Sequence, residues 1–367
     1  MIMYPDYNNS ILNVTATLLK HYNAPSIYAS IPELEVELKK NYNHVVLVLL
    51  DGMGKNIMEE HLKADAFLNK YNRKWITSIF PPTTVAATNA VLSGLPPISS
   101  GYLGWIQYFK KEKANVAVFL NHDYYHPEVK FEELLREKYL KYPTIYEQIQ
   151  KYSLEVNTYE LFPSFRENGF HSFHDQGNRL LEIHKNDLKT FSYVYWTEPD
   201  MTEHDYGIHS KETAKVLNDL NVELERLSEE LSEDALMIVI ADHGLVDVDS
   251  YDLLADKKLL SMLLRMPSME PRATNFFIKP FLKKAFKRHF DIMYSKHFML
   301  LSKNELLDSK LLGTGFKHPL IKDFLGDFIA IAIDQYMFKL GAHSKFVAHH
   351  AGLTQGEMEV PLVMYHK

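Results

Sequence analysis

Two long apolar runs, each ending in an acidic residue, limit most strongly how this chain can fold. Residues 44–50 read HVVLVLL and residues 235–241 read ALMIVIA. Such runs are typical of strands buried on both faces, as in a parallel sheet covered by helices. Asp51 follows the first run, and Asp242 and His243 follow the second. Because open α/β sheets bind ligands at the carboxyl ends of their strands, the sequence predicts a site there.

The stretch FPPTTVAATNAVLSGL at residues 80–95 predicts a short helix that begins at a threonine. Each proline disfavours the helical conformation in the residue before it, so a helix fits from about Thr84, with Gly94 as its end. Thr83 or Thr84 then lies at a helix N-terminus, where free N–H groups and the helix dipole favour a bound phosphate. A hydroxyl in that position indicates a nucleophile, which needs activation.

A third strand pattern, TFSYVYW at residues 190–196, also leads into acidic and imidazole side chains. Asp200 and His204 are four residues apart, which on a helical turn places a carboxylate and an imidazole on one side, as one metal ion requires. Three neighbours compete for that role, Glu203, Asp205 and His209, and the pair His349–His350 offers a further ligand. Three Asp, three His and a threonine are enough to hold two divalent ions.

Composition narrows the choice of metal and of partner. The chain has no cysteine, which excludes disulfides and thiolate ligands. The remaining His and Asp favour zinc, with manganese or iron as competitors. The net charge of -7 argues against a nucleic-acid surface. Residues 1–10 lack the pattern of a signal peptide, and no apolar run approaches the roughly 20 residues of a membrane span. We therefore expect a cytoplasmic protein without a transmembrane segment.

Five motifs together resemble the alkaline phosphatase superfamily, in its nucleotide pyrophosphatase/phosphodiesterase branch. They are LLDGMG (49–54), FPPTTVAATNAVLSGLPP (80–97), EPDMTEH (198–204), ADHG (241–244) and HHAGLTQGEMEVPLV (349–363). The resemblance implies an α/β fold, with a central mostly parallel sheet and helices on both faces. It also implies two sets of metal ligands. Asp51, Asp242 and His243 would hold one ion together with the nucleophile Thr84, and Asp200, His204 and His350 would hold the second.

Two positions depart from the pattern of that branch. Ala351 stands where the family has a glycine after its ligand histidine, which leaves His349 as an alternative to His350. Trp105 stands where the family has an asparagine that contacts the substrate phosphate. We expect Tyr102 and Trp105 to contact the substrate. These aromatic side chains favour a diester, whose second ester group needs an apolar slot.

Residues 249–330 differ from the rest of the sequence in pattern and composition. They show weaker strand–helix alternation and contain more lysine and aromatic residues. We predict a catalytic core of residues 1–248 and 331–367, with residues 249–330 inserted as a cap over the carboxyl ends of the strands.

The resemblance and the ligand pattern predict a two-metal-dependent hydrolase of phosphate esters. The leading hypothesis is a phosphodiesterase or nucleotide pyrophosphatase that acts through a phosphothreonine intermediate on a small phosphate ester, a nucleotide or another diester. A phosphomonoesterase or phosphomutase of the same superfamily is the alternative. Two further alternatives are a hydrolase that uses only activated water, with Thr84 structural, and a non-catalytic metal-binding scaffold.

Overall fold

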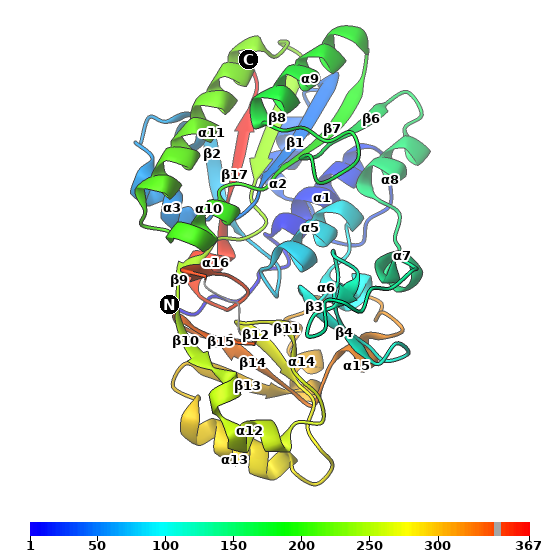
Figure 1. The fold of residues 1–367 in the computed structure, drawn as a ribbon. Coiled ribbons are helices and arrows are strands. Elements are labelled where there is room, and N and C mark those ends of the chain that lie inside the picture. The colour runs from blue at the N-terminus through cyan, green and yellow to red at the C-terminus, as the bar shows by residue number, and fades with distance from the viewer. Residues whose placement is uncertain (341–345) are drawn as a thin grey trace.

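The computed structural model describes residues 1–340 and 346–367. Its centre is a six-stranded sheet in the order β2–β17–β8–β1–β7–β6 (Figure 1). In that order the strands are Asn72–Thr77, Glu359–Tyr365, Ala235–Ile240, His44–Leu50, Thr190–Trp196 and Asn157–Leu161. β8, β1, β7 and β6 pair in parallel, whereas β17 is antiparallel to both of its neighbours. The predicted α/β fold with a mostly parallel central sheet is confirmed.

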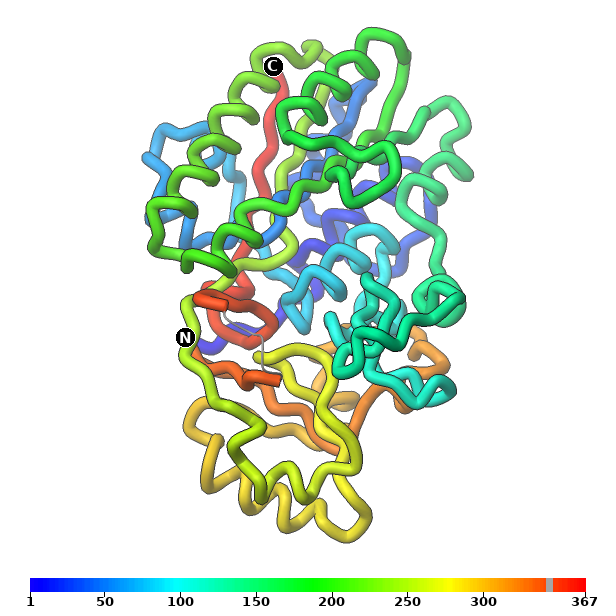
Figure 2. Tube along the Cα trace, in the orientation of Figure 1, coloured from blue at the N-terminus to red at the C-terminus, as the bar shows by residue number. Residues whose placement is uncertain are grey.

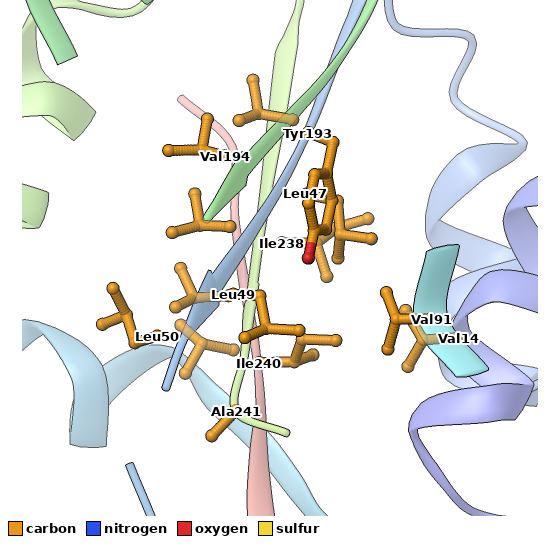
Figure 3. Close-up of a cluster of buried hydrophobic side chains, with 14 of the residues drawn as sticks. Val14, Leu47, Leu49, Leu50, Val91, Tyr193, Val194, Ile238, Ile240 and Ala241 are labelled. Atoms are coloured by element: carbon orange, nitrogen blue, oxygen red, sulfur yellow. The ribbon is translucent and has the colours of Figure 1, made fainter. Parts of the chain in front are cut away.

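Helices cover both faces of this sheet, as predicted (Figure 1). One face carries α1 (Ile11–His21), α5 (Thr84–Ser93) and α8 (Ile145–Tyr152), and the other carries α3 (Lys55–His61), α4 (Phe67–Tyr71), α9 (Phe173–Asn186) and α11 (Lys211–Glu230). Every residue of β1 and β8 is buried, because neither face of these strands meets water. Leu49 and Ile240 of the sheet lie in one apolar cluster with Val14 of α1 and Val91 of α5 (Figure 3).

A second, antiparallel sheet lies beyond the carboxyl ends of the parallel strands (Figure 1). Its order is β13–β14–β12–β11–β3–β4–β5, with bounds Phe298–Ser302, Phe328–Ala332, Ala273–Phe276, Ser268–Glu270, Ile106–Phe109, Ala114–Ala117 and His122–Asp123. The helix α13 (Lys283–Met293) buries Phe286 and Phe290 in the apolar cluster beneath it. The N-terminus of the chain lies between the two sheets, and the C-terminus lies at the far end of the central sheet (Figure 2).

The remaining elements are short. They are α2 (Pro32–Leu38), α6 (Pro97–Ser100), α7 (Leu135–Tyr139), α10 (Asp200–Tyr206), β9 (Val246–Asp247), β10 (Asp249–Asp252), η1 (Leu253–Ala255), α12 (Lys257–Met262), α14 (Lys303–Asp308), α15 (Ile321–Phe324), β15 (Tyr336–Lys339), β16 (Ala348–His349) and α16 (Gln355–Met358). None of the helices in the described ranges is long and apolar enough to span a membrane.

The division into a core of residues 1–248 and 331–367 and a cap of residues 249–330 stays a prediction. The second sheet draws its strands from two parts of the chain: residues 106–123 supply β3, β4 and β5, and residues 268–332 supply the other four. Residues 341–345, inside the predicted core, lie outside the described residues.

A buried pair of histidines makes the stability of the central sheet depend on pH. The ring of His184 in α9 stacks on that of His44 in β1, with centroids 4.2 Å apart. Neither ring nitrogen of His184 has a hydrogen-bond partner among the described residues. Burial, and then the positive charge of His44, lower the pKa of His184 to about 4. The unfolded chain, with an ordinary pKa of about 6.5, therefore binds more protons between these two values.

We expect this pair to stabilise the fold fully above pH 6.5 and to lose its contribution as the pH falls towards 4. When the pH falls from 7.5 to 5, the free energy of unfolding should decrease in the wild type. In His184→Leu this decrease should be smaller by about 2 kcal/mol. Urea unfolding at both pH values measures this difference. His126→Leu, at a side chain that is 70% exposed, controls for the loss of a histidine. Equal pH profiles for His184→Leu and the wild type would contradict the expectation.

Candidate active site

The first group of predicted site residues meets where β1, β8 and α5 end or begin. Asp51 follows β1, Asp242 and His243 follow β8, and Thr84 is the first residue of α5. The His243 Nε2 atom lies 3.5 Å from Asp51 Oδ1 and 3.4 Å from Asp242 Oδ2. The Thr84 hydroxyl lies 3.3 Å from Asp51 Oδ1 and 3.2 Å from His243 Nε2. Four residues from three distant segments therefore point their polar atoms at one place.

The second group forms on α10 and on the segment after β16. The Asp200 Oδ1 atom lies 3.4 Å from His204 Nε2 and 3.8 Å from His350 Nε2. His204 is held in place by Ala348, whose carbonyl oxygen lies 2.8 Å from the second ring nitrogen, Nδ1. The rings of His243 and His350 are 4.0 Å apart, so the two groups adjoin.

Asp200 lies between the two groups. Its carboxylate comes within 4.8 Å of the ligand atoms of His204 and His350, and equally of those of Asp51 and His243. Asp242, which the sequence assigns to the first group, approaches that group through His243. Two ions held here would therefore be neighbours, which a two-metal phosphoesterase site requires.

The distances between the carboxylate and imidazole atoms suit ligands of a shared metal ion better than hydrogen bonds between them. The distances of 3.4–3.8 Å between carboxylate and imidazole are long for hydrogen bonds. Two ligands bound tetrahedrally to one zinc ion stand about 3.3–3.4 Å apart. Asp200 Oδ1 and Asp242 Oδ2 are buried without a hydrogen-bond partner in the described part of the chain, although a buried carboxylate oxygen normally has one. A shared cation accounts for both observations.

The pKa shifts of the buried site residues also indicate a bound cation. Burial raises the pKa of Asp51 well above its usual value, and the negative charges of Asp242 and Asp200 raise it further. Burial, followed by the nearby imidazole of His243, lowers the pKa of His350 well below its usual value. A divalent cation favours the charged carboxylate and the neutral imidazole, so it stabilises this buried set.

Sequence reasoning missed Tyr195, which orients the Asp51 carboxylate. Its hydroxyl donates a short hydrogen bond to Asp51 Oδ2 and leaves Oδ1 to face Thr84 and His243. Tyr195 pairs with Leu49 in the parallel register of β7 and β1, close to the end of both strands. The strand TFSYVYW carries several hydroxyl groups, so the sequence does not single out Tyr195, and its partner Asp51 is identified only once the strand order is known.

The competing ligands proposed from spacing lie elsewhere. His209 binds Glu60 at the surface, with Nδ1 to Oε2 at 2.7 Å, and Asp205 is exposed. Glu203 is buried, yet it belongs to neither group of potential metal ligands among the described residues. His349 Nδ1 accepts a hydrogen bond from the backbone N–H of His350 at 2.9 Å. The structure therefore brings His350, rather than His349, into the second group.

The two predicted substrate contacts lie outside the metal-binding groups. Tyr102 is 5% exposed and packs edge-on against Tyr142, with ring centroids 5.8 Å apart. Trp105 is half-buried against Phe119, and its backbone N–H donates to Glu270 at 2.6 Å. Neither side chain joins the metal-binding groups, and their contact with substrate stays a prediction.

Ala351, where the sequence departs from the glycine of the family pattern, has a φ of 92°. This left-handed conformation is strained for any residue with a Cβ atom. We expect Ala351→Gly to raise the free energy of unfolding by about 1 kcal/mol, measured in urea. Ala330→Gly, in the interior of β14, is the matched control and should lower the free energy of unfolding by a similar amount. Destabilisation by both changes would show that Ala351 is unstrained.

The fold, the paired Asp/His groups and the threonine at a helix start define a metal-dependent phosphodiester hydrolase of the alkaline phosphatase superfamily. The profile of the family "type I phosphodiesterase / nucleotide pyrophosphatase" matches residues 45–353. The chain belongs to this family, which confirms the predicted resemblance and the predicted class of enzyme.

Solved structures share the fold. Murine ectonucleotide pyrophosphatase/phosphodiesterase 5 is 16% identical, with 88% of each chain covered and a TM-score of 0.66. Its human counterpart is 12% identical at the same coverage and TM-score. An inactive variant of the murine protein, in complex with AMP, is 15% identical, with 87% of each chain covered and a TM-score of 0.65. A comparison with curated proteins gives no match.

Proposed function

We propose that this protein hydrolyses phosphodiesters through a phosphothreonine formed at Thr84. The reaction depends on two divalent ions, and zinc is the metal that we propose. The ligands are the predicted ones: Asp51, Asp242, His243 and Thr84 for one ion, and Asp200, His204 and His350 for the other. The observation that carries the proposal is the place of the Thr84 hydroxyl. It lies at the first residue of α5, within 3.3 Å of both Asp51 and His243.

Each step has a residue to perform it. The Thr84 oxygen attacks phosphorus, and the alcohol of the ester leaves from the opposite side. Asp51 Oδ1 and His243 Nε2, which would hold the first ion, lie within reach of this oxygen, so the ion would lower the pKa of the Thr84 hydroxyl and its proton would pass to solvent. Water then attacks the phosphothreonine and releases Thr84 with a phosphate monoester, so one water is consumed per diester. The N–H groups at the start of α5 stabilise the charge on the phosphoryl oxygens. When bound, the two ions supply Lewis acidity that neutralises this charge.

The hydrogen-bond partners of the site residues support a diester rather than a monoester as the substrate. Within the part of the chain that the structure describes, no lysine or arginine donates a hydrogen bond to the seven predicted site residues. A monoester carries a second negative charge and needs such cations, whereas a diester carries one. Nucleotides are the substrate class that we propose, supported by the family and by the AMP bound to a relative of the same fold.

Hydrolysis of two chromogenic esters tests this function. We expect zinc-loaded protein to hydrolyse bis-p-nitrophenyl phosphate with at least about tenfold higher kcat/KM than p-nitrophenyl phosphate. Removal of metal by a chelator should abolish both activities, and added zinc should restore them. Zinc that restored less activity than manganese or iron would reassign the metal. A preference for the monoester would favour a phosphatase or phosphomutase, and activity that survives the chelator would overturn the proposal.

A further inference from the structure

One turn of the second sheet carries two buried charged side chains that bind segments next to the proposed catalytic residues. β11 ends at Glu270, and β12 begins at Ala273. Glu270 is 2% exposed, and Arg272 is completely buried. Charged side chains are almost never buried completely unless they are paired, so the partners of these two indicate their roles.

Glu270 binds the residue that precedes the proposed nucleophile. Its Oε1 atom accepts a hydrogen bond from the Thr83 hydroxyl at 2.7 Å and from the Trp105 backbone N–H at 2.6 Å. Thr83 is the N-cap residue of α5, and a threonine there normally binds the free N–H groups of its own helix. In this structure the Thr83 side chain makes no such bond. Glu270 therefore draws the hydroxyl away and leaves the first N–H groups of α5 open to a phosphoryl group.

Arg272 reaches the segment that carries His350. Its guanidinium donates to both carboxylate oxygens of Glu357, from Nε at 2.7 Å and from Nη2 at 2.8 Å. Glu357 in turn accepts from the Gly352 N–H at 2.6 Å and from the Thr354 N–H at 3.1 Å. A bidentate pair of this kind fixes orientation as well as distance. The segment after His350 is thus tied to the second sheet.

The backbone of the turn is strained immediately before Glu270. Met269 has a φ of 72°, in the left-handed region that a methionine rarely adopts. Such a conformation costs of order 1–3 kcal/mol and persists where surrounding contacts enforce it, often at functional sites.

We propose that residues 269–272 of the second sheet position both halves of the active site. Glu270 keeps the start of α5 uncapped for the phosphoryl group, and Arg272, through Glu357, positions His350. This inference rests on the proposed function. It gives the second sheet a role in positioning the active-site residues.

The Glu270 half is tested by removing and restoring the acceptor. In Glu270→Met, the freed Thr83 hydroxyl caps α5, and kcat for bis-p-nitrophenyl phosphate should fall about 10–100-fold. Glu270→Gln keeps an acceptor oxygen and should stay within about threefold of the wild type. The double variant Glu270→Met/Thr83→Val has no hydroxyl to cap the helix, so it should recover about tenfold over Glu270→Met. A purely structural role predicts no such recovery, and its absence would overturn this half.

The role proposed for Arg272 is tested by measuring zinc affinity, which does not require turnover of a substrate. Arg272→Lys keeps the charge but loses the bidentate pair. We expect it to bind one of the two zinc ions about 10–100-fold more weakly in competition with a chromogenic chelator, while Glu270→Met binds both as the wild type does. If Arg272→Lys does not fold, Thr354→Val, which loses a 2.6 Å hydrogen bond to Glu357, should show a smaller loss of the same kind. Unchanged affinity for both ions would overturn this half.

Controls separate this proposal from the proposed function. Asp256→Asn removes another carboxylate near the second sheet. Its partners are the Leu259 N–H, His289 and Tyr294, none of which is a site residue, so this change should leave kcat unchanged. Wild-type and Thr84→Ala proteins are assayed alongside. If the wild type did not turn over the diester, the proposed function would fail, while the zinc affinities of Arg272→Lys would still decide the second half of this proposal.

Discussion

Thr84→Ala is expected to lower kcat for bis-p-nitrophenyl phosphate by about 10³-fold or more, because it removes the oxygen that attacks phosphorus. The other six ligands remain, so the variant should still bind two ions. Stopped reactions should contain phosphothreonine in the wild type and none in the variant, which mass spectrometry of the peptide with residue 84 detects. Thr84→Ser, which keeps the hydroxyl, should retain activity within about tenfold.

The outcome also decides between the remaining alternatives. Near-full activity of Thr84→Ala with both ions bound would identify a hydrolase that uses activated water, with Thr84 structural. A wild type that binds two ions and turns over neither ester would favour the metal-binding scaffold.

Glu357→Gln is expected to destabilise the fold by about 3–5 kcal/mol, because it leaves the buried Arg272 guanidinium without its counter-charge. Both side chains of this pair are 0% exposed, so water cannot replace the lost partner. The new amide N–H₂ group also faces the donors of Arg272 or Thr354. Urea unfolding with metal-free protein measures the effect without a contribution from bound ions.

An exposed pair provides the comparison. Lys287 and Asp291 on α13 lie 3.0 Å apart, with side chains 56% and 45% exposed. Asp291→Asn should change the free energy of unfolding by less than about 0.5 kcal/mol. If Glu357→Gln were no worse than Asp291→Asn, the buried pair would contribute nothing beyond its surroundings.

The parts that the sequence predicts correctly are those with a local signal. The apolar runs before Asp51 and Asp242 indicate buried strands. Because ligands bind at the carboxyl ends of such strands, the sequence predicts that these two side chains lie in one site. The prolines and Gly94 likewise bound the helix that begins at Thr84, and the structure places that helix at Thr84–Ser93. Each of these inferences needs only neighbouring residues and a general rule.

The parts that stayed hidden depend on contacts between distant residues. Glu270 and Thr83 are 187 positions apart, and Arg272 and Glu357 are 85 apart. Nothing next to Glu270 in the sequence indicates that it is buried. The resemblance favours His350 over His349 as the ligand, and in the structure His350 Nε2 lies 3.8 Å from Asp200 Oδ1, whereas His349 Nδ1 binds the backbone.

The place of β17 has a consequence for how the protein is made. This strand lies between β2 and β8, yet it is synthesised after every other strand of the central sheet. A growing chain on the ribosome therefore keeps a gap in its central sheet until residues 359–365 have emerged. His350 precedes that strand by only a few residues, so the second metal group also stays incomplete until late in translation. Hydrolytic activity consequently arises only when almost all of this sequence has been translated.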